Sequence, residues 1–273
     1  MDLYTISTHS GRGKAVSRPS TNTMNSPGIK IDKVSLQLQD HLVFDSLSLE
    51  FAEQQCHCAL GKSGVGKSSL LNILSGSAPI QAGSVEATNV LNLSNQIAHM
   101  FQDDGLLPWL SVVDNVQLGH RLRGDVTRDS ATRAMDLLST VGLTDWSKHY
   151  PRNLSGGMRQ RVALARTLME DRPIILMDEP FSRLDAITRD ELQVLACELL
   201  NNRTVVLVTH DPAEALRIGD TVTVLHSGFP SSATTFTPTT QTPRAHDDAQ
   251  VLKLTPALWT ALSADSAMSR EVG

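Results

Sequence analysis

Two glycine-rich turns constrain this chain more than any other feature of its sequence. The first is residues 61–68, which read GKSGVGKS, and the second is residues 154–160, which read LSGGMRQ. Free backbone N–H groups at the start of a helix attract anions, so a glycine-rich turn that opens a helix predicts a phosphate site. One phosphate needs only one such site. The pair of turns therefore predicts two copies of the chain closing on shared ATP.

The composition is ordinary for a globular protein, with enough core for one large domain or two small ones. The 273 residues are 40% hydrophobic and 19% charged, and the formal net charge is −5. A mildly acidic chain without a basic block gives no reason to expect a nucleic-acid partner. No apolar run approaches the roughly 20 residues that span a bilayer. We therefore expect a cytoplasmic protein.

Three cysteines are too few for a disulfide framework, and two of them flank a histidine in Cys56-His57-Cys58. This triplet raises the alternative of a metal site. Adjacent side chains of a strand point to opposite faces, however, and the spacing matches no common zinc pattern. We favour the interpretation that these are buried residues of the strand that enters the first glycine-rich turn.

The N-terminal residues 1–27 are rich in Ser, Thr, Gly and Pro and are predicted to be a disordered extension. Met24 stands just before the first strand-like run, which suggests a start at Met24 as a hypothesis that N-terminal sequencing would test. Residues 28–228 are predicted to form one nucleotide-binding domain. Apolar residues alternate over 29–51, which predicts antiparallel strands that turn near Asp40 and His41.

The rest of the pattern predicts an α/β fold. Strands are expected at 55–60 and 97–101, and short continuous apolar runs at 174–177 and 205–208 are typical of buried parallel strands. Helices are expected at 67–74, 156–169 and 185–201, the last making a β-α-β unit. Helical spacing predicts a helical subdomain inserted at about 104–153. Residues 229–273 are expected to be a Thr/Ser/Pro-rich loop to about 245 and a short tail with an apolar run at 251–262. The expected fold is thus a P-loop NTPase core with a mostly parallel sheet, an N-terminal antiparallel β subdomain and the helical insertion.

The first glycine-rich turn has the chemistry of a phosphate loop. Glycines permit its tight curve and let backbone N–H groups approach the phosphates, and Lys67 adds a positive charge. The hydroxyl of Ser68 suits Mg²⁺, which prefers hard oxygen ligands. A chance glycine-rich turn is the alternative, which the strand–turn–helix context disfavours. The residues predicted to bind nucleotide here are Gly61, Ser63, Gly64, Gly66, Lys67, Ser68 and Ser69.

Polar side chains follow three predicted strands, where catalytic groups of α/β proteins gather. Asp178 is expected to hold Mg²⁺, and Glu179 is the candidate base for an attacking water. His210 ends the next strand, beside the strand end that carries Glu179. Gln102 follows the 97–101 strand and is expected to sense Mg²⁺ or water through its amide. The alternative is that Asp178 and Glu179 only cap the following turn.

The ordered set of motifs resembles the ATP-binding subunit of an ABC transporter over about residues 29–226. Walker A is at 61–68, the Q-loop at Gln102, the signature at 154–160, Walker B at 174–178, the D-loop at 182–185 and the switch histidine at His210. The resemblance implies a head-to-tail homodimer, although a heterodimer stays open. In that dimer Ser155, Gly156 and Gly157 would contact the γ-phosphate held by Lys67 of the partner subunit, and Asp185 would support the opposing phosphate loop.

The segment 106–116 resembles the importers of nitrate, sulfonates and taurine, a group that includes transporters of a thiamine pyrimidine precursor. The resemblance implies two further partners: integral membrane permease subunits on the cytoplasmic face of the inner membrane and, indirectly, a periplasmic solute-binding protein. Leu107, Pro108 and Trp109 would contact the permease. The alternative places Trp109 in the core of the helical subdomain. The sequence does not identify the solute.

Two positions depart from the family pattern. The family stacks adenine on an aromatic residue of the first hairpin, where this chain has Leu38; the nearby Phe44 is expected to face the core. Base recognition is therefore expected to be loose. Arg183 replaces the usual alanine of the D-loop, and its sequence position alone leaves open whether it binds the partner subunit or reaches solvent.

Two other functions are compatible with ATP binding. A soluble ABC ATPase of DNA repair or translation would carry long coiled coils or a second cassette in the chain, and this sequence contains neither. A regulatory binder without activity would not need Lys67, Asp178, Glu179 and His210 together.

Overall fold

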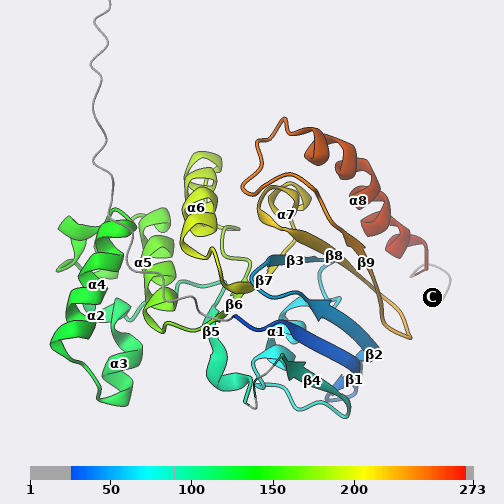
Figure 1. Ribbon diagram of the computed structural model, residues 1–273, viewed down its shortest axis with the longest axis horizontal. Coiled ribbons are helices and arrows are strands. Elements are labelled where there is room, and N and C mark those ends of the chain that lie inside the picture. Colours follow the sequence, from blue (N-terminus) through cyan, green and yellow to red (C-terminus); the bar gives the residue numbers. More distant parts are fainter. Residues whose placement is uncertain (1–25, 89, 91, 269–273) are drawn as a thin grey trace, which may run out of the picture.

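The computed structural model describes residues 26–88, 90 and 92–268, which form a layered α/β structure with a helical region at one end (Figure 1). One sheet has six strands in the order β5-β6-β7-β3-β8-β9, and the other has three in the order β2-β1-β4. The strands are β1 (Ile29–Leu38), β2 (His41–Phe51), β3 (Cys56–Leu60), β4 (Ala82–Ala87), β5 (Ile97–Met100), β6 (Ile174–Asp178), β7 (Thr204–Thr209), β8 (Thr221–His226) and β9 (Ser232–Phe236). The α-helices are α1 (Lys67–Leu74), α2 (Val112–Val116), α3 (Leu118–Arg123), α4 (Arg128–Thr140), α5 (Gly156–Met169), α6 (Ala186–Leu199), α7 (Pro212–Ile218) and α8 (Ala249–Met268).

The six-stranded sheet is buried on both faces. Its strands β5, β6, β7, β3 and β8 run parallel, and β9 closes one edge in antiparallel pairing with β8. Side chains alternate between the faces: Ile175 and Met177 of β6 pack with α5 to α8, whereas Ile174 and Leu176 pack with α1 and the three-stranded sheet. This two-sided burial explains the continuous apolar runs of β6 and β7. The predicted fold class is confirmed.

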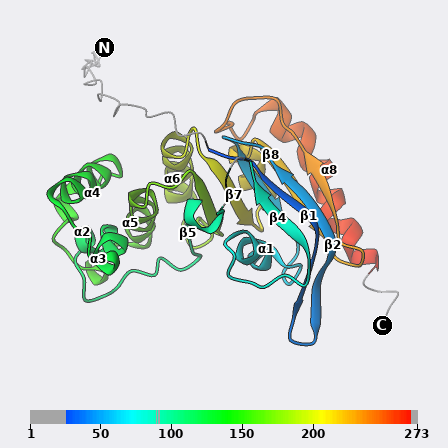
Figure 2. The ribbon, with the colours of Figure 1, turned by 60° about the horizontal axis from the view of Figure 1, so that its bottom comes forward.

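The helical region packs on the outer side of α5. Its core joins residues of α2 and α4 to Val162, Ala165 and Met169 of α5, while Ala163, Leu164 and Leu168 of the same helix pack toward the sheet. Helix α5 is therefore covered on two sides, and it joins the helical region to the sheet (Figure 2). The helices predicted within 104–153 are present.

The segment after residue 228 differs from the expected loop and tail. Residues 232–236 form β9, and α8 lies against the molecule, with Val251 and Leu258 buried in the core that includes α7. The Arg244 guanidinium is 2% exposed and donates to the carbonyls of Leu216 and Gly219 at 2.8 and 2.7 Å. The loop prediction was wrong for 232–236 because threonine-rich segments favour strands where a neighbouring strand offers pairing.

The N-terminal boundary also differs from the prediction. Ser26 is fully buried, and its hydroxyl donates to the carbonyl of Asn202 at 2.8 Å. The hydroxyl of Thr204 donates to the carbonyl of Pro27 at 2.9 Å. Ser26 and Pro27 therefore belong to the fold rather than to the predicted extension. Residues 1–25, with Met24, lie outside the described residues.

Among the helices of the described residues, none combines the length and the apolar character needed to cross a bilayer.

Helix α8 supplies a test of whether the C-terminal segment is part of the cooperative fold. Leu258 is fully buried, so Leu258→Ala should lower the free energy of unfolding by about 2–5 kcal/mol. Leu252, on the same helix, is 61% exposed, so Leu252→Ala should change it by less than about 0.5 kcal/mol. Urea unfolding measures the free energy of unfolding of both variants. Equal stability of the two variants would show that α8 unfolds independently.

Candidate nucleotide site

The phosphate loop joins the end of β3 to the start of α1. Gly66 is the N-cap of α1 with φ of 100°, and a Cβ atom there would lie 2.7 Å from Cζ of Phe44. Gly64 also has a left-handed φ, of 84°. Side chains at these positions would be strained or would clash, so the sequence needs glycine to form this curve. The free N-terminus of α1, with no acidic residue in its first turn, is a suitable phosphate site.

Lys67 lies beneath this loop. Its ammonium donates to the carbonyls of Gly61 and Lys62 at 2.8 and 3.0 Å, and the residue is buried. Burial lowers the pKa of Lys67 from its ordinary value, while the carboxylates of Glu179 and Asp178 act in the opposite direction. A buried ammonium whose hydrogen bonds go to neutral carbonyl groups favours an anion as its next ligand. Ser63 and Ser68 are exposed and Ser69 is half-buried, the last two in the first turn of α1.

Glu179 is the centre of a three-residue contact at the carboxyl edge of the sheet. Its Oε2 lies 3.1 Å from Nδ1 of His210 and accepts from Nε2 of Gln102 at 3.2 Å. Gln102 comes after β5, Glu179 after β6 and His210 after β7, and these strands are neighbours in the sheet, so the structure brings the three residues together as the strand order predicts. Glu179 has φ of 42°, and its N–H donates to the carbonyl of Val208 at 2.9 Å. This bond holds the residue in a conformation that L-residues rarely adopt.

The second glycine-rich turn opens α5. Ser155 is its N-cap and accepts from the N–H of Met158 at 3.3 Å. A Cβ atom at Gly157 would lie 2.3 Å from Cγ2 of Thr188, so glycine permits the close approach of α6. Helix α1 packs on one face of the large sheet and α5 on the other. Within one chain, the two predicted phosphate sites therefore belong to opposite layers.

Asp185 begins α6 and is exposed. Its carboxylate accepts from the N–H of Thr188 at 3.1 Å, and its hydrogen bonds with Thr188 lower the pKa of Asp185. Beside it, Arg183 forms an ion pair with Asp103 of the same chain. This contact is one that sequence position alone could not supply.

The structure also decides three alternatives left by the sequence. Phe44 is 3% exposed and packs behind the phosphate loop, so the prediction that it faces the core is confirmed, while Leu38 is 42% exposed. Trp109 is 70% exposed, so the core interpretation is wrong. Cys58 and His57 are buried in β3, and the described residues contain no cluster of three or more potential metal-binding side chains, which supports the buried-strand interpretation.

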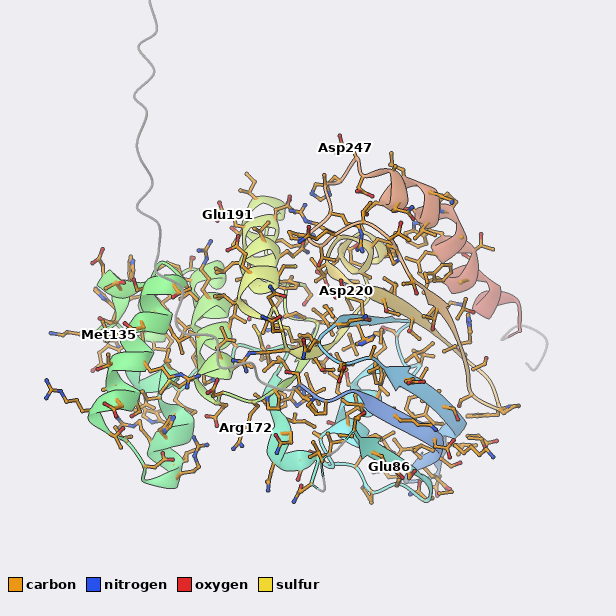
Figure 3. The ribbon with its side chains drawn as sticks, viewed as in Figure 1. Glu86, Met135, Arg172, Glu191, Asp220 and Asp247 are labelled. Atoms are coloured by element: carbon orange, nitrogen blue, oxygen red, sulfur yellow. The ribbon has the colours of Figure 1, made fainter. Side chains whose placement is uncertain are left out.

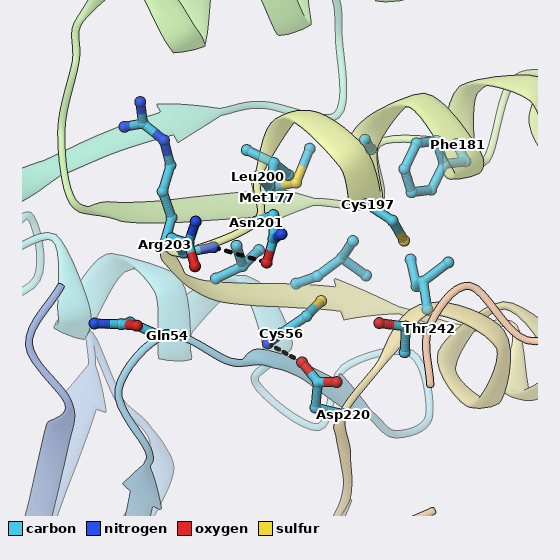
Figure 4. Close-up of a pocket in the computed structure, with 15 residues that line it drawn as sticks. Gln54, Cys56, Met177, Phe181, Cys197, Leu200, Asn201, Arg203, Asp220 and Thr242 are labelled. Atoms are coloured by element: carbon cyan, nitrogen blue, oxygen red, sulfur yellow. Dashed lines mark hydrogen bonds between the residues drawn. The ribbon is translucent and has the colours of Figure 1, made fainter. Parts of the chain in front are cut away.

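A small cavity lies beside this strand (Figure 4). It has a volume of about 60 Å³, and Cys56, Cys197 and Asp220 are among its lining residues. The carboxylate of Asp220 accepts from the N–H of Cys56 at 2.8 Å, which ties β8 to β3 near the middle of the molecule (Figure 3). Burial raises the pKa of the Cys197 thiol to about 12. This thiol stays protonated at neutral pH and is therefore a poor nucleophile.

Two comparisons with known proteins agree with this geometry. The family model described as ABC transporter matches residues 44–182. The aliphatic sulfonates import ATP-binding protein SsuB 1 of Rhodococcus jostii (strain RHA1) is 43% identical over 209 residues, which are 76% of this chain and 81% of the relative. The chain belongs to the ABC transporter family. It is an ABC ATPase, which binds and hydrolyses ATP.

Two further ABC proteins are similar to this chain over most of its length. The taurine import ATP-binding protein TauB of Rhizobium johnstonii is 41% identical over 185 residues, 66% of this chain and 71% of the relative. The solved post-hydrolysis dimer of the ATP-binding cassette MJ0796, bound to ADP and Pi, is 31% identical with a TM-score of 0.62. That match covers 72% of this chain and 93% of the solved chain.

Sequence reasoning missed a buried carboxyl group behind the His210 turn. Glu214 of α7 is 5% exposed and accepts from Nε2 of Gln193 at 3.2 Å. Desolvation raises the pKa of Glu214 to about 7. An acidic residue in the first turn of a helix is typical of exposed helix starts, so no local pattern signals this burial.

The raised pKa of Glu214 predicts a pH-dependent stability. The folded protein binds a proton that the unfolded chain releases, so the stabilisation is full below pH about 4 and is lost as the pH rises toward 7. Relative to Glu214→Gln, the wild type should lose about 2–3 kcal/mol of unfolding free energy between pH 5 and pH 8. Urea unfolding of both proteins at the two pH values measures this difference. Parallel pH profiles would contradict the assignment.

Proposed function

We propose that this ABC ATPase works as a homodimer that powers import of a small solute through a separate membrane permease. The solute is an organic anion of the sulfonate or taurine class or a thiamine pyrimidine precursor. The SsuB and TauB relatives are import ATP-binding proteins for aliphatic sulfonates and for taurine, which supports the import direction and the first of these solute classes. In this assignment the ATPase lies on the cytoplasmic face of the inner membrane, and a periplasmic solute-binding protein delivers the cargo to the permease.

The observation that carries the proposal is the contact of Gln102 and His210 with one carboxylate oxygen of Glu179. A carboxylate fixed by two side chains is oriented to accept a proton from an attacking water. Such a general base contributes about 10²–10⁴ in rate. Lys67 exchanges its two loop carbonyls for the phosphates of ATP and stabilises their charge.

Mg²⁺ fits the residues beside the phosphate loop. The Ser68 hydroxyl, the Asp178 carboxylate and the Gln102 amide oxygen are hard donors, and Mg²⁺ prefers a few such ligands together with water. When bound, the ion supplies neutralisation of the negative charge that develops on the phosphates. Asp178 suits this role because it ends the buried strand β6 with its side chain half-buried.

A dimer completes the site because one chain places its two glycine-rich turns on opposite layers. Ser155, Gly156 and Gly157 of one subunit are proposed to bind the phosphate that the other subunit holds. Asp185 is exposed beside the same region, where it can support the opposing phosphate loop. The similarity to the solved ABC dimer supports this arrangement.

The segment 107–111 is proposed to contact the permease. Its shape is fixed by the buried Asn115, which accepts from the N–H of Leu107 at 2.8 Å and donates to the carbonyls of Leu107 and Leu110 at 3.2 Å each. Pro108 and Trp109 are exposed on this rigid turn, beside the half-buried Leu107. An exposed aromatic ring on a fixed loop is typical of an anchor in a protein interface.

The dimer proposal predicts the behaviour of Glu179→Gln. Loss of the base should slow hydrolysis by about 10²–10⁴ while ATP binding persists, so the ATP-bound dimer should accumulate. Size-exclusion chromatography with light scattering measures the amount of dimer in ATP. Lys67→Ala is the matched variant, which should stay monomeric because it binds ATP poorly. A Glu179→Gln protein that is monomeric in saturating ATP would contradict the proposal.

The permease proposal predicts that Trp109→Ala separates transport from hydrolysis. Removing an interface anchor should lower transport about tenfold or more in the assembled transporter and leave the ATPase activity of the isolated subunit within about twofold. Leu122→Ala removes another exposed apolar side chain, at 79%, and is the control that should leave both activities unchanged. Equal loss of transport and isolated ATPase activity in Trp109→Ala would contradict a role in docking.

A further inference from the structure

The ion pair between Asp103 and Arg183 connects two loops that are 80 residues apart in the sequence. Asp103 directly follows Gln102, and Arg183 lies four residues after Glu179. The side chains are 72% and 61% exposed. Exposed ion pairs contribute little to folding stability. The role of this pair must therefore be sought in what it positions.

Both loops also bond to Glu179. On one side the Gln102 amide donates to the Glu179 carboxylate at 3.2 Å. On the other, the Ser182 hydroxyl donates to the Glu179 carbonyl at 3.0 Å. The ion pair therefore closes a ring of contacts that begins and ends at the catalytic base.

Arg183 is presented from a rigid backbone. Phe181 and Leu184 on either side are 1% and 6% exposed and belong to the main core. Arg189 reinforces the turn by donating to the carbonyls of these two residues at 3.3 and 2.8 Å. With its neighbours fixed in this way, Arg183 can hold Asp103 rather than follow it.

The Gln102 loop is held from the opposite side by α5. The Arg159 guanidinium pairs with Asp104 at 2.9 Å, and Arg166 donates to the carbonyls of Asp104 and Gly105 at 2.5 and 2.8 Å. The loop then continues into the segment that carries Trp109. Residues 102–105 therefore lie between α5 and the turn after Glu179, and the Asp103–Arg183 ion pair joins them to that turn.

We infer that the Arg183–Asp103 ion pair is a positioning contact that keeps the Gln102 amide on Glu179. This inference rests on the proposed role of Glu179 as the base. It assigns a role to the arginine that departs from the family pattern, within its own subunit rather than across the dimer.

The test is a charge-reversal cycle in the full-length ATPase. Arg183→Ala and Asp103→Asn should each lower kcat about threefold to fivefold, a loss of the size that an exposed ion pair supplies, with the KM for ATP within about twofold. Arg183→Asp combined with Asp103→Arg should recover most of the wild-type kcat, and Arg183→Lys should retain it. Arg121→Ala is the control, because it removes an exposed ion pair with Asp114 elsewhere in the chain and should leave kcat unchanged.

Two results would overturn the inference: wild-type kcat in both single variants, or a reversed pair whose kcat is as low as the product of the single losses. The proposed function fails separately. If Glu179→Gln hydrolysed ATP at the wild-type rate, the base assignment would be wrong whatever the outcome of the cycle.

Discussion

Burial of a parallel sheet on both faces is the constraint on which this molecule depends. Parallel strands covered by helices send all their carboxyl ends to one edge, and the loops that leave this edge must meet there. Strands β3, β5, β6 and β7 lie together in the sheet, and the phosphate loop, Gln102, Glu179 and His210 follow them in turn. The contact of Gln102 and His210 with Glu179 is thus a consequence of strand order. Apolar packing within the sheet supplies the rigidity that the polar contacts need.

The same layering explains why one chain is an incomplete catalyst in our account. Helix α1 lies on the face shared with the three-stranded sheet, and α5 lies on the face shared with α6 to α8. A triphosphate bound at the start of α1 is therefore served by the first glycine-rich turn of its own chain. In the proposed dimer, the second turn is available to the phosphates that another subunit holds.

Much of this architecture is predictable from the sequence because it depends on local signals. Continuous apolar runs identify β6 and β7. The glycines at 61–66 identify the phosphate loop, because its tight curve requires them. The signature helix was predicted with the bounds Gly156–Met169 that the structure shows. The roles of the side chains at strand ends, Gln102, Glu179 and His210, were predicted from the order of the motifs and from the family resemblance.

What could not be predicted depends on contacts between distant segments. Strand β9 forms because β8 offers an edge, and the threonine-rich sequence around it resembles a loop when read alone. The partner of Arg183 is 80 residues away, and the burial of Glu214 depends on how α7 packs against α6. Each of these features is set by tertiary packing, which overrides the local pattern.

Hydrolysis at a shared site requires two subunits, and the dependence of ATPase activity on protein concentration measures this requirement directly. If two chains share each ATP, the rate per subunit in saturating ATP should fall as the protein is diluted below the dimer dissociation constant, and should recover on concentration. A rate per subunit that stays constant through the range where light scattering shows only monomer would contradict the shared site.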